Sequence, residues 1–355
     1  MAVPAAPACL DRIAARVDAR IDSLLTAEIA RWRDVDADLA EPLAALHRLV
    51  TAGGKRLRPA FCHWGFVGAG GDPDDPLVVD AGAALELLHT FALVHDDVMD
   101  GSAIRRGVPT VHAAFAGRHT VDRWRGEPRR FGEGVAILVG DLAFVYADRL
   151  LAEAPRAAHD VFTELRLEVN VGQYLDLLGT VRGGVDIEQA RRISRYKSGK
   201  YTIERPLHLG AALAGRLDEL AESLSAFGEP LGEAFQLRDD LLGAFGDTAV
   251  TGKPVGEDLR EGKPTALYTW AVERATGPGA DLLASRFGTA DLGPVEVAEL
   301  QAVLEETGAR REVEDAIERL VAEALGALEQ LGPRLQPEAV THLAELAHFV
   351  AGRDR

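Results

Sequence analysis

Cysteine, aromatic residues and long uncharged apolar runs are all scarce in this chain of 355 residues. Its two cysteines, Cys9 and Cys62, are far apart and lack the spacing of a metal site. We therefore expect no disulfide framework, and a reducing, cytoplasmic location fits this cysteine usage. Hydrophobic residues make up 47% of the chain, which is enough for a large core without such cross-links.

Sequence features of membrane targeting and of nucleic-acid binding are also missing. Acidic residues and arginines occur too early in the first twenty residues for the apolar region of a secretory signal. No stretch approaches about 20 uncharged apolar residues, so we predict no membrane span. The formal net charge of −17 argues against nucleic acid as a partner. An anionic substrate would need cations and a local basic cluster to receive it.

Helix-forming sequence, in contrast, is abundant. The chain is rich in Ala, Leu, Glu and Arg, and clear alternating strand patterns are absent. Apolar residues recur at helical spacing in residues 10–30, 83–98, 135–151, 158–178, 217–242 and 313–331. Short Gly and Pro breaks between these segments are typical of turns rather than of interdomain linkers. We predict an all-α helical bundle that forms a single domain over residues 1–355.

One break, at residues 117–134, is longer than the others and is rich in arginine. It contains Arg118, Arg123, Arg125, Arg129 and Arg130. We predict a mobile basic loop, which is either a solvated surface excursion or a lid over a site.

Two apolar helical segments each end in a pair of aspartates. The first ends in Asp96, Asp97 and Asp100, and a helix places Asp96 and Asp100 one turn apart on one face. The second ends in Asp239 and Asp240. Clustered carboxylates repel one another unless a cation neutralises them, and oxygen ligands suit a hard ion such as Mg²⁺. If the two motifs face each other, they would hold divalent ions that bind a diphosphate.

Basic residues occur close to both aspartate motifs. They are Lys55, Arg56, Arg58, Arg105 and Arg106 around the first motif, and Lys197, Lys200, Lys253 and Lys263 around the second. Arg and Lys are the usual phosphate ligands, although a single one is more often a salt bridge or a solvated residue. Because the pattern recurs in a chain of strongly negative charge, it indicates a bound anion.

The order of the motifs resembles a known family. GGKRLRP, HDDVMD, RRG, GQYLDL, YKSGK, FQLRDD, GKP and EGK follow one another within residues 40–270. In this order they resemble the trans-isoprenyl diphosphate synthases, also called polyprenyl synthetases. The resemblance implies an isoprenoid-synthase fold with a deep central cavity, a homodimer, and Mg²⁺-dependent condensation of isopentenyl diphosphate with an allylic prenyl diphosphate by head-to-tail (1′-4) elongation.

The resemblance also implies roles for individual residues. The metal-binding aspartates are Asp96, Asp97, Asp100, Asp239 and Asp240, which hold about three Mg²⁺ ions per active site. Allylic diphosphate is assigned to Arg105, Lys197 and Lys253, and isopentenyl diphosphate to Lys55, Arg58, His89 and Arg106. Gln173 and Gln236 line the reaction centre, and Lys263 is a further substrate-binding residue. The residues expected to act in catalysis are Arg105, Lys197, Ser198, Gln236 and Lys253.

The second aspartate motif departs from the family pattern. Its usual third aspartate is Gly243, so one carboxylate of this motif is in doubt, and Asp247 is a candidate to compensate. Since Asp239 and Asp240 remain, we expect Gly243→Asp to be tolerated. Ser198 stands where the family commonly has threonine. Because serine keeps the hydroxyl group, we expect little effect of this difference.

Three other functions remain open on the sequence. A terpene cyclase would share the first motif but would carry an Asn/Asp–Ser/Thr–Glu triad in place of Asp239 and Asp240. A non-catalytic partner subunit would tend to lose an aspartate motif, and Gly243 keeps that reading open. His95, with His63 and His112, could suggest a metal phosphohydrolase, although no other spacing supports one.

Product length is predicted from the residues before Asp96. The fifth position before it is Phe91 and the fourth is Ala92, and nothing is inserted between Asp97 and Asp100. One aromatic residue without an insertion resembles the geranylgeranyl diphosphate synthases. The alternatives are a farnesyl or a longer-chain diphosphate synthase, and Phe91 could instead be an ordinary core residue.

Overall fold

The computed structural model describes residues 7–105, 107–182, 186–246, 256–289 and 291–352. These residues fall into two compact units. We call Ala8–His63 with Gly71–Pro155 the N-terminal unit, and Trp64–Gly70 with Arg156–Arg355 the C-terminal unit. Each unit is described by itself, and the predicted single domain over residues 1–355 stays a prediction.

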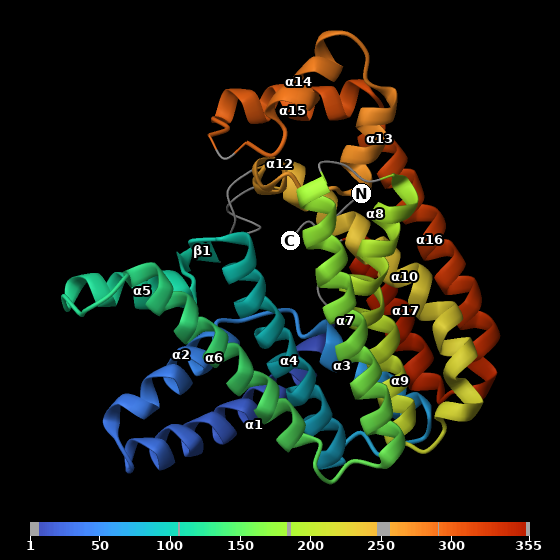
Figure 1. Ribbon diagram of the computed structural model, residues 1–355. Coiled ribbons are helices and arrows are strands. Elements are labelled where there is room, and N and C mark those ends of the chain that lie inside the picture. The colour runs from blue at the N-terminus through green and yellow to red at the C-terminus, as the bar shows by residue number, and fades with distance from the viewer. Residues whose placement is uncertain (1–6, 106, 183–185, 247–255, 290, 353–355) are drawn as a thin grey trace. The chain divides into compact units, whose positions relative to one another are not determined.

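The N-terminal unit is built from long helices (Figure 1). Its elements are α1 (Ala8–Arg33), η1 (Ala37–Leu39), α2 (Ala40–Thr51), the start of α3 (Leu57–Gly68), α4 (Pro76–Asp100), α5 (Val111–Val121) and α6 (Pro128–Leu150). A short β-hairpin follows α4. Its two antiparallel strands have two residues each, β1 (Ile104–Arg105) and β2 (Val108–Pro109). Helix α4 packs against α6 and α1, which makes it the central helix of this unit.

The C-terminal unit is also helical. Its elements are the end of α3, α7 (Arg156–Arg182), α8 (Ile187–Ser194), the π-helix η2 (Arg195–Glu204), α9 (Arg205–Leu213), α10 (Leu217–Phe245), α12 (Glu257–Glu261), α13 (Ala266–Arg274), α14 (Pro278–Arg286), α15 (Pro294–Glu306), α16 (Ala309–Leu331), η3 (Gly332–Arg334) and α17 (Pro337–Gly352). Helix α10 packs against α16 and η2, and α7 packs against η2 and α9. The prediction of an all-α fold is confirmed, as are all six predicted helical segments.

Local sequence explains why α4 begins and ends where it does. The side chain of Asp75 accepts a hydrogen bond from the backbone N–H of Leu77, and Pro76 occupies the first turn. Gly101 adopts a left-handed conformation with φ of 68°, which ends the helix directly after Asp100. By length and composition α4 could cross a membrane, yet 61% of its most apolar window is buried in the structure. A core helix passes the same test, so this is weak evidence for a span.

The prediction of a mobile basic loop at residues 117–134 is wrong. Helix α5 continues to Val121 and α6 begins at Pro128, so a short connection replaces the loop. Glu127 caps α6 by accepting hydrogen bonds from the backbone N–H groups of Arg129 and Arg130. Buried His119 contacts the rings of Trp124 and Phe131 across the connection. The arginine-rich composition masked an aromatic cluster that closes a helical hairpin.

Candidate active site

The first aspartate motif forms the last turn of α4. Asp96 and Asp100 are half-buried and lie one turn apart, as the sequence predicts, whereas Asp97 is buried. Burial raises the pKa of the Asp97 carboxyl, and Arg105 opposes that rise. The three carboxylates therefore differ in environment, and Asp96 and Asp100 are the two that reach a more open face.

Arg105 is positioned on this motif by the hairpin that follows α4. Its Nε donates to Oδ1 of Asp97 at 2.8 Å, and its Nη2 lies 2.6 Å from the same oxygen. The same Nη2 lies 3.9 Å from Oδ2 of Asp96. Pairing of Arg105 in β1 with Val108 in β2 turns the chain back and places the guanidinium beside the carboxylates. The structure thus brings together Arg105, Asp96 and Asp97.

Two aromatic side chains before the first motif, Phe91 and His95, lie on one face of α4 and contact α6. His95 donates from Nε2 to the backbone carbonyl oxygen of Ile137 in α6 at 3.0 Å. Gly140 makes room for it, because a Cβ there would lie 2.3 Å from the same nitrogen. Phe91, one turn earlier, contacts His95 edge-on with ring centroids 4.6 Å apart. The hydrogen bond and close packing of His95 against α6 are those of a structural residue rather than a metal ligand.

The GGKRLRP segment contains one structural arginine beside the predicted substrate ligands. Arg56 is buried and donates to Asp18 at 2.8 Å, to Glu86 at 2.6 Å and to the carbonyl oxygen of Val50 at 2.6 Å. Its φ of 51° is rare for a residue other than glycine, and these bonds help to hold that conformation. Lys55 and Arg58 on either side are half-buried. The family resemblance assigned Lys55 and Arg58 to substrate and gave Arg56 no role, but the sequence did not show that Arg56 is buried.

The second aspartate motif lies near the end of α10, within the C-terminal unit. Asp240 is 4% exposed and accepts a hydrogen bond from Nε2 of Gln236, one turn earlier, at 2.7 Å. Asp239 is half-buried. Burial, together with the nearby charges of Asp258, Asp239 and Asp176, raises the pKa of Asp240 to about 8. Gln236 and the two predicted aspartates are thus neighbours.

Lys197 reaches this cluster through a residue to which sequence analysis gave no role. Its Nζ lies 2.6 Å from Oδ2 of Asp176 in α7. The backbone of η2 approaches α7 closely because Gly172 has no side chain; a Cβ there would lie 2.4 Å from the backbone nitrogen of Lys197. Asp176 stands three residues after Gln173, so the two share a face of α7. That spacing within GQYLDL was the available signal.

The remaining predicted residues are partly placed. His89 is half-buried on α4, and Ser198 is half-buried in η2. Lys263 follows α12, and its Nζ lies 2.6 Å from Oε2 of Glu261. Arg106, Lys253 and Asp247 lie outside the described residues.

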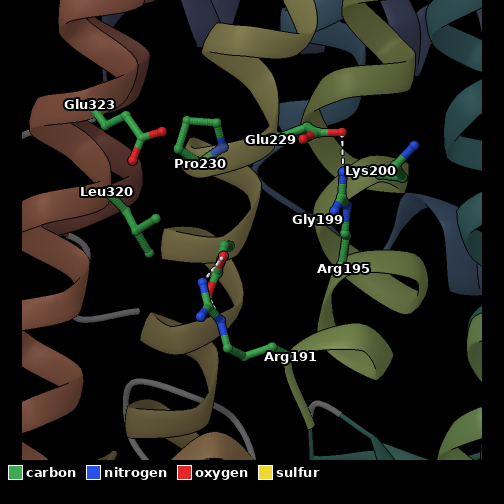
Figure 2. A pocket seen from close by; sticks show the side chains of 9 residues that line it. Arg191, Arg195, Gly199, Lys200, Glu229, Pro230, Leu320 and Glu323 are labelled. Carbon is green, nitrogen blue, oxygen red and sulfur yellow. Dashed lines mark hydrogen bonds and ion pairs between the residues drawn. The ribbon is translucent and has the colours of Figure 1, made fainter. Parts of the chain in front are cut away.

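A separate pocket of about 170 Å³ opens between α8, η2, α10 and α16 (Figure 2). Arg191 and Arg195 project into it from one wall, each paired with a glutamate of α10, at 2.6 Å for Arg191–Glu233. Leu320 and Glu323 of α16 form the opposite wall. Lys200, one of the basic residues noted around the second motif, also lines it and lies 2.9 Å from Oε1 of Glu168. The arginine charges of the pocket are balanced by glutamates.

The two aspartate clusters fit a hard divalent cation. Each offers carboxylate oxygens, the ligands that Mg²⁺ prefers, and each also has a basic side chain beside it. In the C-terminal unit, Asp240 is kept in a buried position with other acidic groups close enough to raise its pKa. Such an arrangement is costly for anionic carboxylates without a counter-charge. The donor set therefore agrees with a bound metal ion.

Comparisons with known proteins point to one family. The family model described as polyprenyl synthetase matches residues 41–306. A geranylfarnesyl diphosphate synthase of Aeropyrum pernix is 35% identical over 279 residues, covering 73% of this chain and 82% of that protein. A geranylgeranyl diphosphate synthase of Sulfolobus acidocaldarius is 37% identical over 250 residues, covering 67% and 69%.

A solved structure extends the similarity to the fold. The geranylgeranyl pyrophosphate synthase of Corynebacterium glutamicum, complexed with isoprenyl diphosphate and magnesium, matches with a TM-score of 0.91 and 37% identity. The match covers 96% of this chain and 99% of that one. The predicted isoprenoid-synthase type of helical fold is confirmed by this likeness.

Proposed function

This chain belongs to the polyprenyl synthetase family of trans-prenyltransferases, and we propose that it elongates allylic diphosphates with isopentenyl diphosphate to geranylgeranyl diphosphate. Elongation follows from membership in the family. The twenty-carbon product is the proposal, because the relatives' names include both geranylgeranyl and geranylfarnesyl diphosphate synthases. An enzyme with several anionic substrates and a net charge of −17 needs cations at its active site.

The proposed cation is Mg²⁺, with about three ions per active site. Asp96, Asp100 and Asp239 would bind the ions directly, and Asp97 and Asp240 would act on them through water or through neighbouring groups. Bound Mg²⁺ would neutralise charge on the diphosphate leaving group. In the described residues, Arg105 and Lys197 are the proposed ligands of the allylic diphosphate, together with Lys253. Lys55, Arg58 and His89, together with Arg106, would hold isopentenyl diphosphate, and Lys263 would add a further basic group to the substrate site.

The proposed reaction needs no protein nucleophile. The allylic C–O bond breaks, leaving a delocalised carbocation and diphosphate, whose charge Arg105 and Lys197 stabilise by hydrogen bonding. The double bond of isopentenyl diphosphate attacks the cation and forms the new C–C bond. The proton then lost from the adduct goes to the departed diphosphate. Gln173, Gln236 and Ser198 would orient the reacting groups, and apolar walls would exclude water.

The observation that carries the product length is the position of Phe91. Its ring is fixed between His95 and Phe144, with the Phe144 centroid 5.0 Å away. Asp96 lies five positions later in the helix, a rise of about 7 to 8 Å. A fixed aromatic ring at that depth supports its role as the floor that stops the growing chain, whereas Ala92 beside it leaves space.

Product analysis of Phe91→Ala tests this proposal. We expect products longer by one or more isoprene units, measured by chromatography after dephosphorylation. Phe131→Ala is the matched control, because it removes an equal volume from the same unit but lies in the aromatic cluster beside α5. An unchanged product distribution in a folded, active Phe91→Ala enzyme would remove Phe91 from the role of floor.

We further propose that the enzyme is a cytoplasmic homodimer. Exposed apolar side chains run along one face of α7, at Leu167, Val171, Tyr174 and Val181. Within the other unit, α6 exposes Phe131, Ile137, Leu138 and Val145. Rows of large exposed apolar residues favour burial against a partner. The mass measured by light scattering would test this, and replacement of Leu138 and Val145 by glutamate should give monomers.

A further inference from the structure

The space beside Gly243 is filled by the carboxylate of Asp258. A Cβ built on Gly243 in α10 would lie 1.8 Å from Oδ2 of Asp258 and 2.5 Å from its Cγ. The side chain of Asp258 therefore fills the space in which a side chain at position 243 would begin. In the family pattern, that space belongs to the third aspartate of the second motif. The missing acid is replaced in space by one that lies fifteen positions later in the chain.

The fold around α12 fixes the backbone of Asp258. Gly256 and Gly262 flank the short helix in left-handed conformations, with φ of 72° and 68°. The carbonyl oxygen of Asp258 accepts hydrogen bonds from the backbone N–H groups of Gly262 and Lys263. Leu259 is buried, and its carbonyl oxygen accepts from the N–H of Gly288 at 2.9 Å. Packing and hydrogen bonds thus hold α12 so that Asp258 faces α10.

Asp258 is also electrostatically part of the second motif. Its carboxylate lies close enough to that of buried Asp240 for the two charges to interact, as do the carboxylates of Asp239 and Asp176. Asp176 is paired with Lys197, and Gln236 donates to Asp240. Asp258 faces this group from a third element, and carboxylates from α10 and α12 therefore converge on the place where the family pattern binds metal.

We propose that Asp258 supplies the third carboxylate of the second aspartate motif, and that Gly243 is required because it leaves room for this carboxylate. The inference rests on the proposed function, in which the second motif helps to hold divalent cations. It revises the expectation that Gly243→Asp is tolerated, because an added carboxylate would collide with Asp258 and repel it. The glycine at position 243 is then compensated by Asp258 and does not indicate that the metal site is lost.

Mn²⁺ binding in the presence of inorganic diphosphate tests the proposal without any turnover. Binding is measured by electron paramagnetic resonance of free Mn²⁺, and the fold of each variant is checked by circular dichroism. We expect Asp258→Asn to weaken Mn²⁺ binding by about tenfold or more, as loss of a metal-site group generally does. Gly243→Ala should weaken it similarly, because the added methyl group displaces the same carboxylate. Asp315→Asn, an exposed acid on α16, is the matched control and should bind as the wild type does.

A paired exchange makes the test specific. Gly243→Asp combined with Asp258→Ala returns one carboxylate to the same space, so the double variant should bind Mn²⁺ nearly as tightly as the wild type. Gly243→Asp alone should bind Mn²⁺ more weakly than the wild type. Wild-type Mn²⁺ affinity in folded Asp258→Asn, alongside weakened binding in Asp239→Asn, would overturn the role of Asp258 and leave the proposed function intact. If the wild-type protein with diphosphate bound no Mn²⁺, the proposed function itself would fail.

Discussion

The ammonium group of Lys197 lies 2.6 Å from a carboxylate oxygen of Asp176, and both side chains are largely buried. Asp176 is on α7 and Lys197 is on η2, where Gly172 allows the two backbones to meet. This ion pair fixes the position of a lysine that we assign to the allylic diphosphate. We therefore propose that Asp176 is a positioning residue, which acts through Lys197 rather than on the substrate.

Asp176→Asn should weaken binding of the allylic substrate selectively. Without the carboxylate, the ammonium loses the partner that orients it, and the Michaelis constant for the allylic diphosphate should rise about tenfold, equivalent to about 1.4 kcal/mol. The constant for isopentenyl diphosphate should stay within about twofold, because we assign that substrate to other residues. Steady-state kinetics with each substrate varied in turn would measure both. Equal rises in the two constants would point to a general structural defect instead.

Substitution of Arg56 should lower stability, whereas substitution of Arg58 should weaken substrate binding. Arg56→Ala leaves the buried carboxylate of Glu86 without its partner, so the free energy of unfolding should fall by about 3 to 5 kcal/mol. Urea denaturation followed by circular dichroism would measure this. Arg58→Ala should unfold close to the wild type but raise the Michaelis constant for isopentenyl diphosphate. A selective rise for the allylic substrate would mean that the two diphosphate sites are assigned in reverse.

Local patterns predicted the features that depend on residues close together in sequence. The spacing of Asp96 and Asp100 was sufficient because a helix puts residues four apart on one face. The long helices followed from apolar periodicity in the same way. The segment 117–134 was misjudged because its arginines are conspicuous, whereas its order comes from ring contacts between His119, Trp124 and Phe131.

Features that depend on tertiary contacts were not predictable from one sequence. Arg56 and Arg58 look alike in GGKRLRP, and only the packing of α1, α2 and α4 decides that Arg56 is buried. The sequence gives no signal that Asp258 occupies the space at Gly243, because this contact exists only in the folded chain. The sequence indicated that a carboxylate was missing, but not where its replacement lay.

His208 should make stability depend on pH in the acidic range. Burial, and then the charge of Arg205, lowers the pKa of this imidazole to about 4. Between about pH 4 and about 6.5 the unfolded chain binds a proton that folded His208 does not, so the free energy of unfolding should fall as the pH drops through this range. The free energy of unfolding lost between neutral pH and about pH 4 is about 3 kcal/mol. Around the ring lie Arg205, Lys200, Glu168 and Ser225, and the Ser225 hydroxyl donates to Glu204.

Comparison with His208→Gln isolates this contribution, since glutamine does not titrate and the other groups are shared. The difference in unfolding free energy between the two proteins should narrow steadily from pH 7 to pH 4. Glu204, whose pKa is raised chiefly by burial, acts in the opposite direction in both proteins and cancels in the difference. A constant difference across that range would show that His208 titrates normally in the folded protein.

The most direct test of the enzyme assignment is turnover of radiolabelled isopentenyl diphosphate with dimethylallyl, geranyl or farnesyl diphosphate as the primer. With Mg²⁺ the protein should elongate these primers to a twenty-carbon diphosphate. Excess chelator should abolish the reaction, and Asp96→Asn should reduce it by about a hundredfold or more, since metal bridging contributes several kcal/mol to the transition state. Full incorporation of label in the presence of chelator, or no incorporation with any primer and Mg²⁺, would contradict the account.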